Sequence, residues 1–131
     1  MDALEPQIRE LFEALEHAGE PAASEGAQLL CAEAGLEATG TRVRFALRLG
    51  DGRLLEVRYR TYGCPHTLAT CEWLARSLEG RGLDTLTVGN PIEWAQQLGV
   101  PTAKLGRLLV IEDALLAALR PVWNPDAVPG L

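Results

Sequence analysis

The chain has 131 residues, a formal net charge of −6 and a hydrophobic content of 47%, which predicts one globular domain with its own core. It has no long apolar run and no basic segment ahead of an apolar one at its start, so neither a membrane span nor a secretory signal is expected. The acidic composition, with 5% aromatic residues and an odd set of three cysteines, argues against nucleic acid as a partner and favours a reduced cytoplasmic protein.

Residues 1–18 are predicted to form an amphipathic helix. Glutamates alternate there with apolar side chains that recur at helical spacing, namely Leu4, Ile8, Leu11, Phe12 and Leu15. A linker with several glycines and a proline follows over residues 19–26.

Residues 27–62 are predicted to form an antiparallel sheet of three strands, at 28–34, 42–49 and 54–62. Leucine and alanine in the first segment also suit a helix. The second alternates strictly between arginines and a set of apolar residues, namely Val43, Phe45, Leu47 and Leu49. A turn signal at residues 50–52 joins it to the third, where one face is expected to hold Leu55, Val57 and Tyr59. Such a sheet has one face left to cover.

Residues 64–120 are predicted to supply the helices that cover that face. The first runs to about residue 78, the second follows Asn90 as its N-cap, and the last runs to about Leu119 with Thr102 as a possible cap. Residues 124–131 are expected to form a loose tail. A run of strands followed by a run of helices predicts an α+β fold, a three-stranded antiparallel sheet covered on one face by helices.

Cys64 is the residue with the clearest chemical potential. It follows Gly63 at the end of the third strand, and Pro65 suits the first position of a helix, so Cys64 is expected at the N-cap. Unpaired N–H groups and the helix dipole favour a thiolate there. Cys64 is therefore a candidate metal ligand or sulfur nucleophile, and the alternative is a turn cysteine without chemistry. Cys71 is expected in the core, and Cys31 has no assigned role.

The sequence shows no second candidate catalytic site besides Cys64. The sequence contains no nucleophile elbow, phosphate-binding loop or dinucleotide fingerprint. His17 sits on the predicted first helix and is given no function. No enzymatic activity is therefore expected beyond a sulfur-acceptor role.

The order of elements, with Arg60-Thr61-Tyr62-Gly63-Cys64 at the turn from sheet to helix, resembles the U-type iron–sulfur cluster scaffold of the IscU or NifU N-terminal type. The shared spacing covers about 65 residues of the sequence. Positions that support it are Gly52, Arg58, Gly80, Leu83, Asp84, Leu98, Pro101, Lys104, Glu112, Asp113 and Ala114. The resemblance implies an IscU- and SufE-like fold and a role in iron–sulfur cluster assembly. It also implies a cluster, iron or zinc held by three cysteines, an aspartate and, in many members, a histidine.

The chain departs from that ligand pattern. At the matching positions it has Thr39 for the first cysteine, Thr41 for the aspartate, Gly106 for the histidine and Arg107 for the third cysteine. Cys64 alone cannot complete a site that needs about four ligands. His66 is a further candidate ligand, although its spacing is no recognised zinc pattern and a solvent-facing role is the alternative.

Three functions remain open. The first is a U-type assembly protein with an incomplete metal or cluster site. The second is a persulfide acceptor that uses Cys64; the resemblance implies that Arg107 approaches this thiol, where it would stabilise the thiolate and lower its pKa. The third is a binding module that kept the fold and lost the chemistry. The resemblance implies a cysteine desulfurase or another iron–sulfur assembly protein as partner.

Overall fold

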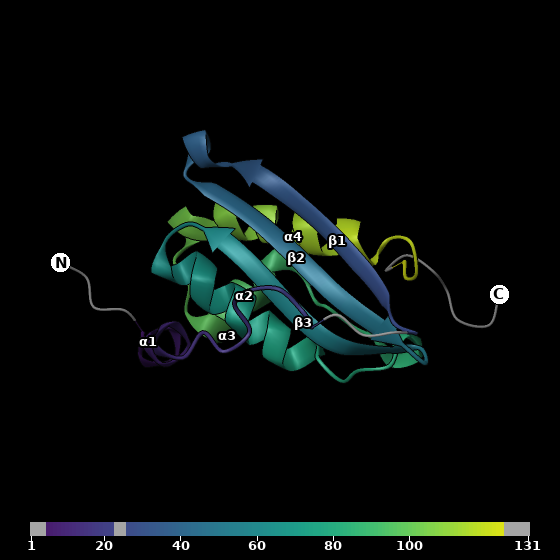
Figure 1. Cartoon of the computed structure of the whole chain (residues 1–131). Coiled ribbons are helices and arrows are strands. Elements are labelled where there is room, and N and C mark those ends of the chain that lie inside the picture. Colours follow the sequence, from purple (N-terminus) through teal and green to yellow (C-terminus); the bar gives the residue numbers. More distant parts are fainter. Residues whose placement is uncertain (1–4, 23–25, 125–131) are drawn as a thin grey trace.

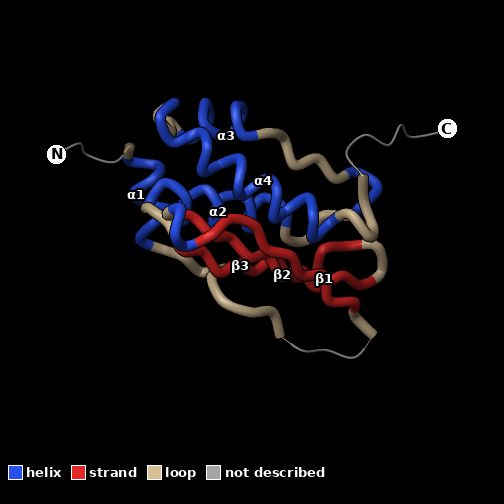
Figure 2. The backbone as a smooth tube through the Cα atoms, turned by 90° about the horizontal axis from the view of Figure 1, so that it is seen from above, coloured by secondary structure: helices blue, strands red, loops and turns tan. Residues whose placement is uncertain are grey.

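The computed structural model describes residues 5–22 and 26–124 (Figure 1). Its helices and strands are α1 (Pro6–Glu13), β1 (Gln28–Leu36), β2 (Thr41–Gly50), β3 (Arg53–Tyr62), α2 (Pro65–Leu78), α3 (Pro91–Leu98) and α4 (Leu105–Leu119). The strands pair antiparallel in the order β1-β2-β3. Figure 2 shows α2, α3 and α4 on one side of this sheet. The predicted α+β fold is confirmed. Within the described residues, no helix is both long enough and apolar enough to cross a membrane.

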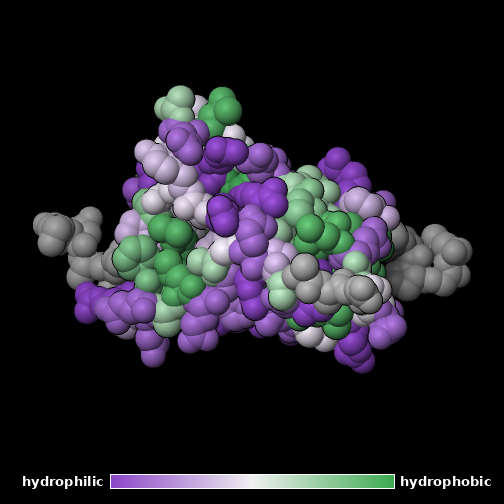
Figure 3. Space-filling view, viewed as in Figure 1, coloured by the Kyte–Doolittle hydropathy of each residue, from purple (hydrophilic) through white to green (hydrophobic). Residues whose placement is uncertain are grey.

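The sheet buries one face because β2 alternates as its sequence predicts. Val43, Phe45 and Leu47 are fully buried, while the arginines between them point to the other face and form ion pairs with glutamates. Figure 3 shows hydrophilic side chains running across the face that the helices leave uncovered. The turn between β2 and β3 uses Asp51 and Gly52, both with positive φ, as a tight hairpin requires.

The predicted inward face of β3 is wrong at Leu55. The pairing register shifts between Arg48 and Leu49, so Arg48 faces Glu56 and Leu49 faces Leu54. Leu55 is thus an extra residue in a bulge, which reverses the alternation on its N-terminal side. Leu54 is buried in its place, and Leu55 is 38% exposed.

Two helix predictions also need correction. The first helix is confined to α1, shorter than the predicted 1–18; Phe12 on it is exposed, and Leu4 lies outside the described residues. The last helix is not capped by Thr102, which lies in a 3-10 turn over Thr102–Lys104 with no side-chain cap. Asn90 does cap α3, because its side chain accepts a hydrogen bond from the Glu93 N–H. Of the predicted tail, residues 125–131 lie outside the described part.

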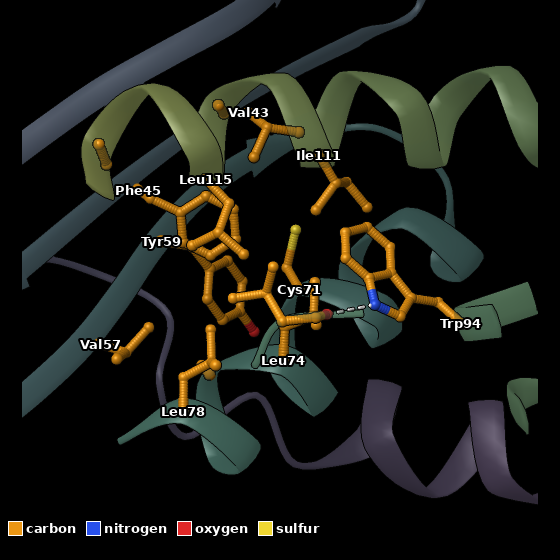
Figure 4. Packing of buried hydrophobic residues seen from close by; sticks show 14 of the residues in the cluster. Val43, Phe45, Val57, Tyr59, Cys71, Leu74, Leu78, Trp94, Ile111 and Leu115 are labelled. Atoms are coloured by element: carbon orange, nitrogen blue, oxygen red, sulfur yellow. Dashed lines mark hydrogen bonds between the residues drawn. The ribbon is translucent and has the colours of Figure 1, made fainter. Parts of the chain in front are cut away.

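The core lies between the sheet and the helices (Figure 4). Phe45 and Tyr59 from the strands meet Leu74 from α2 and Ile111 from α4, all of them buried. Trp94 of α3 closes one side, and its indole N–H donates to the Val88 carbonyl at 2.8 Å. Burying these large side chains supplies most of the favourable free energy of folding.

A buried carboxylate fixes the segment after α1 to this core. Glu72 on α2 has no exposed surface. It accepts hydrogen bonds from the His17 backbone N–H at 2.9 Å, the Tyr59 hydroxyl at 2.8 Å and the Arg76 Nε at 2.8 Å, and its other contact is with His17 Nδ1 at 2.6 Å. Desolvation opposes the charged form, but the bonds from Arg76, His17 and Tyr59 hold the pKa of Glu72 below its usual range. Ala18 then pairs with the edge of β3.

Candidate functional site

Cys64 lies where β3 gives way to α2. Its backbone is extended and occupies the N-cap, and Pro65 is the first residue of the helix. Gly63 allows the strand to approach the first helical turn, because a Cβ at that position would lie 3.0 Å from Cβ of Thr67. The local geometry predicted around Cys64 is therefore present.

The surroundings of Cys64 favour its thiolate. The side chain is half-buried, and its sulfur lies 3.4 Å from the Thr67 hydroxyl. Burial raises the pKa of Cys64, but hydrogen bonds from the Thr67 side chain and backbone, the Arg107 side chain and the His66 backbone outweigh it and lower the pKa below the ordinary thiol value. Thr67 stands three residues after the N-cap, a spacing that identifies such a partner from sequence alone.

Arg107 reaches this thiol from the first turn of α4, 43 positions further along the chain (107 minus 64). Its side chain comes close enough to the Cys64 thiol to help lower the pKa of that group. The structure thus brings together the two residues that the sequence analysis singled out as thiol and thiolate partner.

His66 belongs to the same end of the molecule and is partly buried. Desolvation, followed by the charges of Lys104 and Arg107, lowers its pKa below the ordinary histidine value. Arg107 therefore acts on both Cys64 and His66, and Lys104 acts on His66. Lys104 was absent from the predicted site, because its position in the turn before α4 becomes relevant only once α4 packs near α2.

The other expected ligand positions offer no metal donor. Thr41 begins β2 and pairs with Leu36 of β1, and the next residue, Arg42, pairs with Tyr62 at the end of β3. Thr39 is exposed, with its hydroxyl bonded to the Leu36 carbonyl at 2.8 Å. Gly106 is exposed beside Arg107.

Within the described residues, no group of three or more histidine, cysteine, aspartate or glutamate side chains is placed to hold a metal ion. A structural zinc needs about four such ligands and an iron–sulfur cluster usually four thiolates or imidazoles. The side chains around Cys64 therefore do not fit a closed metal or cluster site.

The remaining cysteines differ from Cys64. Cys71 is fully buried in the core, as predicted (Figure 4). Burial raises the pKa of its thiol to about 12, and its sulfur lies 3.3 Å from the Thr61 hydroxyl. Cys31 is exposed on β1, and its sulfur accepts a hydrogen bond from Arg44 at 3.5 Å.

A sequence model of the NifU-like N-terminal domain matches residues 4–122. The chain belongs to this family. A bifunctional protein NifU/MnmA of Rubrobacter xylanophilus is 39% identical over 103 residues, which cover 75% of this chain and 21% of that protein. The iron–sulfur cluster assembly scaffold protein IscU of Escherichia coli K12 is 27% identical over 86 residues, 65% of this chain and 67% of its own length.

A solved structure supports the same fold for this NifU-like domain. The N-terminal part of a nitrogen-fixing NifU-like protein from Brucella abortus superposes with a TM-score of 0.62 at 16% identity, covering 90% of this chain and 92% of that one. The chain spans about a fifth of the length of the NifU/MnmA relative and about half of the yeast and plant iron–sulfur cluster assembly proteins that it matches. The family membership and the fold are thus established, and the activity is inferred from the site.

Proposed function

We propose that this NifU-like protein takes part in iron–sulfur cluster assembly and accepts sulfur on Cys64. The observation that carries the proposal is the half-buried Cys64 thiol at the N-terminus of α2, with its sulfur 3.4 Å from the Thr67 hydroxyl and the Arg107 side chain nearby. A lowered thiol pKa increases the fraction of nucleophilic thiolate near neutral pH. Relatives named as iron–sulfur cluster assembly proteins supply the process in which such a thiol would work.

The proposed step is a persulfide transfer from a cysteine desulfurase. The Cys64 thiolate attacks the terminal sulfur of the desulfurase persulfide, a new S–S bond forms on Cys64, and the bond within the donor persulfide breaks. The donor leaves as a thiolate, and the transferred sulfur keeps its proton. No electrons are gained or lost overall, so the step needs no oxidant or reductant.

Arg107 would stabilise the attacking thiolate, and also the persulfide anion once the transferred sulfur has lost its proton to solvent. Its guanidinium carries a permanent positive charge and several donors, and it lies near the thiol in the free protein. Persulfide chemistry requires a reduced thiol, so the proposal places the protein in a reducing compartment such as the cytoplasm.

The test is transfer from a cysteine desulfurase loaded with persulfide, followed by mass spectrometry of the intact protein. The wild type and Cys31→Ser are expected to gain one sulfur atom per chain, and Cys64→Ser none. Cys31→Ser is the matched control because it removes a second accessible thiol. Equal sulfur gain by Cys64→Ser, or no gain by the wild type, would contradict the proposal.

A further inference from the structure

We infer that the Cys64 site excludes metal ions, because the described residues around the thiol supply too few metal ligands and a cationic side chain, that of Arg107, lies beside it. The consequence is that the chain binds neither zinc nor an iron–sulfur cluster with its own side chains. This inference concerns metal binding and is independent of whether Cys64 accepts sulfur.

The first support is the set of donors. In the described part of the chain, Cys64 does not belong to any group of three or more cysteine, histidine, aspartate or glutamate side chains that could hold a metal ion. The expected ligand positions hold Thr39, Thr41 and Gly106, none of which supplies a thiolate, imidazole or carboxylate. A single thiolate with one partly buried imidazole, that of His66, leaves a zinc or iron ion far short of its preferred coordination.

The second support is the charge. The Arg107 side chain lies near the Cys64 thiol and favours its charged form. Lys104 and Arg107 both act on His66 in the direction expected of nearby positive charge. A divalent ion at Cys64 would be repelled by the guanidinium of Arg107 in a half-buried place, where the repulsion is only partly screened.

Rebuilding the ligands tests this reasoning directly. The substitutions Thr39→Cys, Gly106→His and Arg107→Cys, made together, supply with Cys64 three thiolates and an imidazole and remove one cation. The positions tolerate change: Thr39 and Gly106 are exposed, and a Cβ at Gly106 meets nothing within 4 Å. The matched control carries the same three changes with Cys64→Ser, and all proteins also carry Cys31→Ser to remove the exposed thiol.

The measurements are zinc content after dialysis against Zn²⁺, competition with a chelator, and the absorption of thiolate-bound Co²⁺. The protein without rebuilt ligands is expected to retain no stoichiometric zinc and to assemble no cluster on anaerobic incubation with iron and sulfide. The rebuilt protein should bind one zinc about a hundredfold or more tightly than either the unmodified site or the Cys64→Ser control, because even outer-shell changes alter metal affinity by 10–100-fold.

Two results would overturn the inference. One is stoichiometric zinc or a cluster on the unmodified site that disappears with Cys64→Ser. The other is a rebuilt protein that keeps its circular dichroism spectrum and still binds no zinc. Metal exclusion would then not be caused by the residues at positions 39, 106 and 107. Sulfur transfer is measured separately by mass, so failure of the proposed function leaves these readings intact.

Discussion

Replacing Glu72 with glutamine removes a buried negative charge and keeps the shape of the side chain. The carboxylate has no exposed surface and accepts hydrogen bonds from three groups, the His17 backbone, Tyr59 and Arg76, with His17 Nδ1 at 2.6 Å as a further contact. Breaking a buried charged network by removing one partner costs about 3–5 kcal/mol. We expect Glu72→Gln to lower the free energy of unfolding by that amount. The glutamine NH2 group is a donor, so at least one of the surrounding donors would lose its acceptor.

The assay is urea unfolding followed by circular dichroism, with thermal unfolding as a second measurement. For a chain of this size about 3–4 °C of melting temperature corresponds to 1 kcal/mol, so a fall of roughly 9–20 °C is expected. Glu10→Gln is the matched control, because Glu10 is exposed on α1. A Glu72→Gln effect no larger than the roughly 0.5 kcal/mol of a surface substitution would refute the reasoning.

The same carboxylate predicts a pH dependence. The pKa of Glu72 is lower in the folded protein than its ordinary value, so the unfolded chain takes up a proton at higher pH than the folded one. The stabilisation is therefore complete above the unfolded pKa of about 4.3 and is lost as the pH falls through the folded value. The difference in free energy of unfolding between the wild type and Glu72→Gln should shrink as the pH falls through this acidic range. A difference that stays constant there would contradict a lowered pKa for Glu72.

Three further predictions concern the thiols and the core. Arg107→Ala should raise the pKa of Cys64, because a nearby group that favours the thiolate is lost, and the pH profile of alkylation by iodoacetamide should move to higher pH. Cys71 should resist alkylation in the folded protein and react once guanidinium unfolds it, since it is fully buried and its pKa is raised to about 12. Ile111→Ala should lower the free energy of unfolding by about 2–5 kcal/mol in urea titrations, because Ile111 is fully buried.

Matched variants separate these effects from general damage. Arg120→Ala, an exposed change at the opposite end of α4, should leave the alkylation profile of Cys64 in place. Leu109→Ala removes a side chain that is 49% exposed and should cost within about 0.5 kcal/mol. If Arg120→Ala moved the alkylation profile as far as Arg107→Ala, or Leu109→Ala cost as much stability as Ile111→Ala, the contacts of Arg107 and Ile111 would not be responsible.

The residues predicted well are those whose environment is set by close neighbours in the chain. The alternation of β2 places Val43 and Phe45 in the core, because side chains of a strand point to opposite faces with a period of two. Asn90 and Cys64 stand at helix starts because a proline follows each and fixes a helical φ. The same local logic fails at Leu55, where one extra residue in the ladder reverses the face without any mark in the sequence.

The amino-acid sequence by itself determined the strands, the helix starts and the identity of the thiol at the N-terminus of α2, since each depends on spacing within a few residues. Only the tertiary structure decided what those residues meet. His17 joins Glu72 across 55 positions, and Lys104 acts on His66. The family resemblance pointed to Arg107 as a neighbour of Cys64, but the two residues come close because α2 and α4 pack on the same face of the sheet. Contacts between distant segments depend on how whole elements pack, which local spacing does not encode.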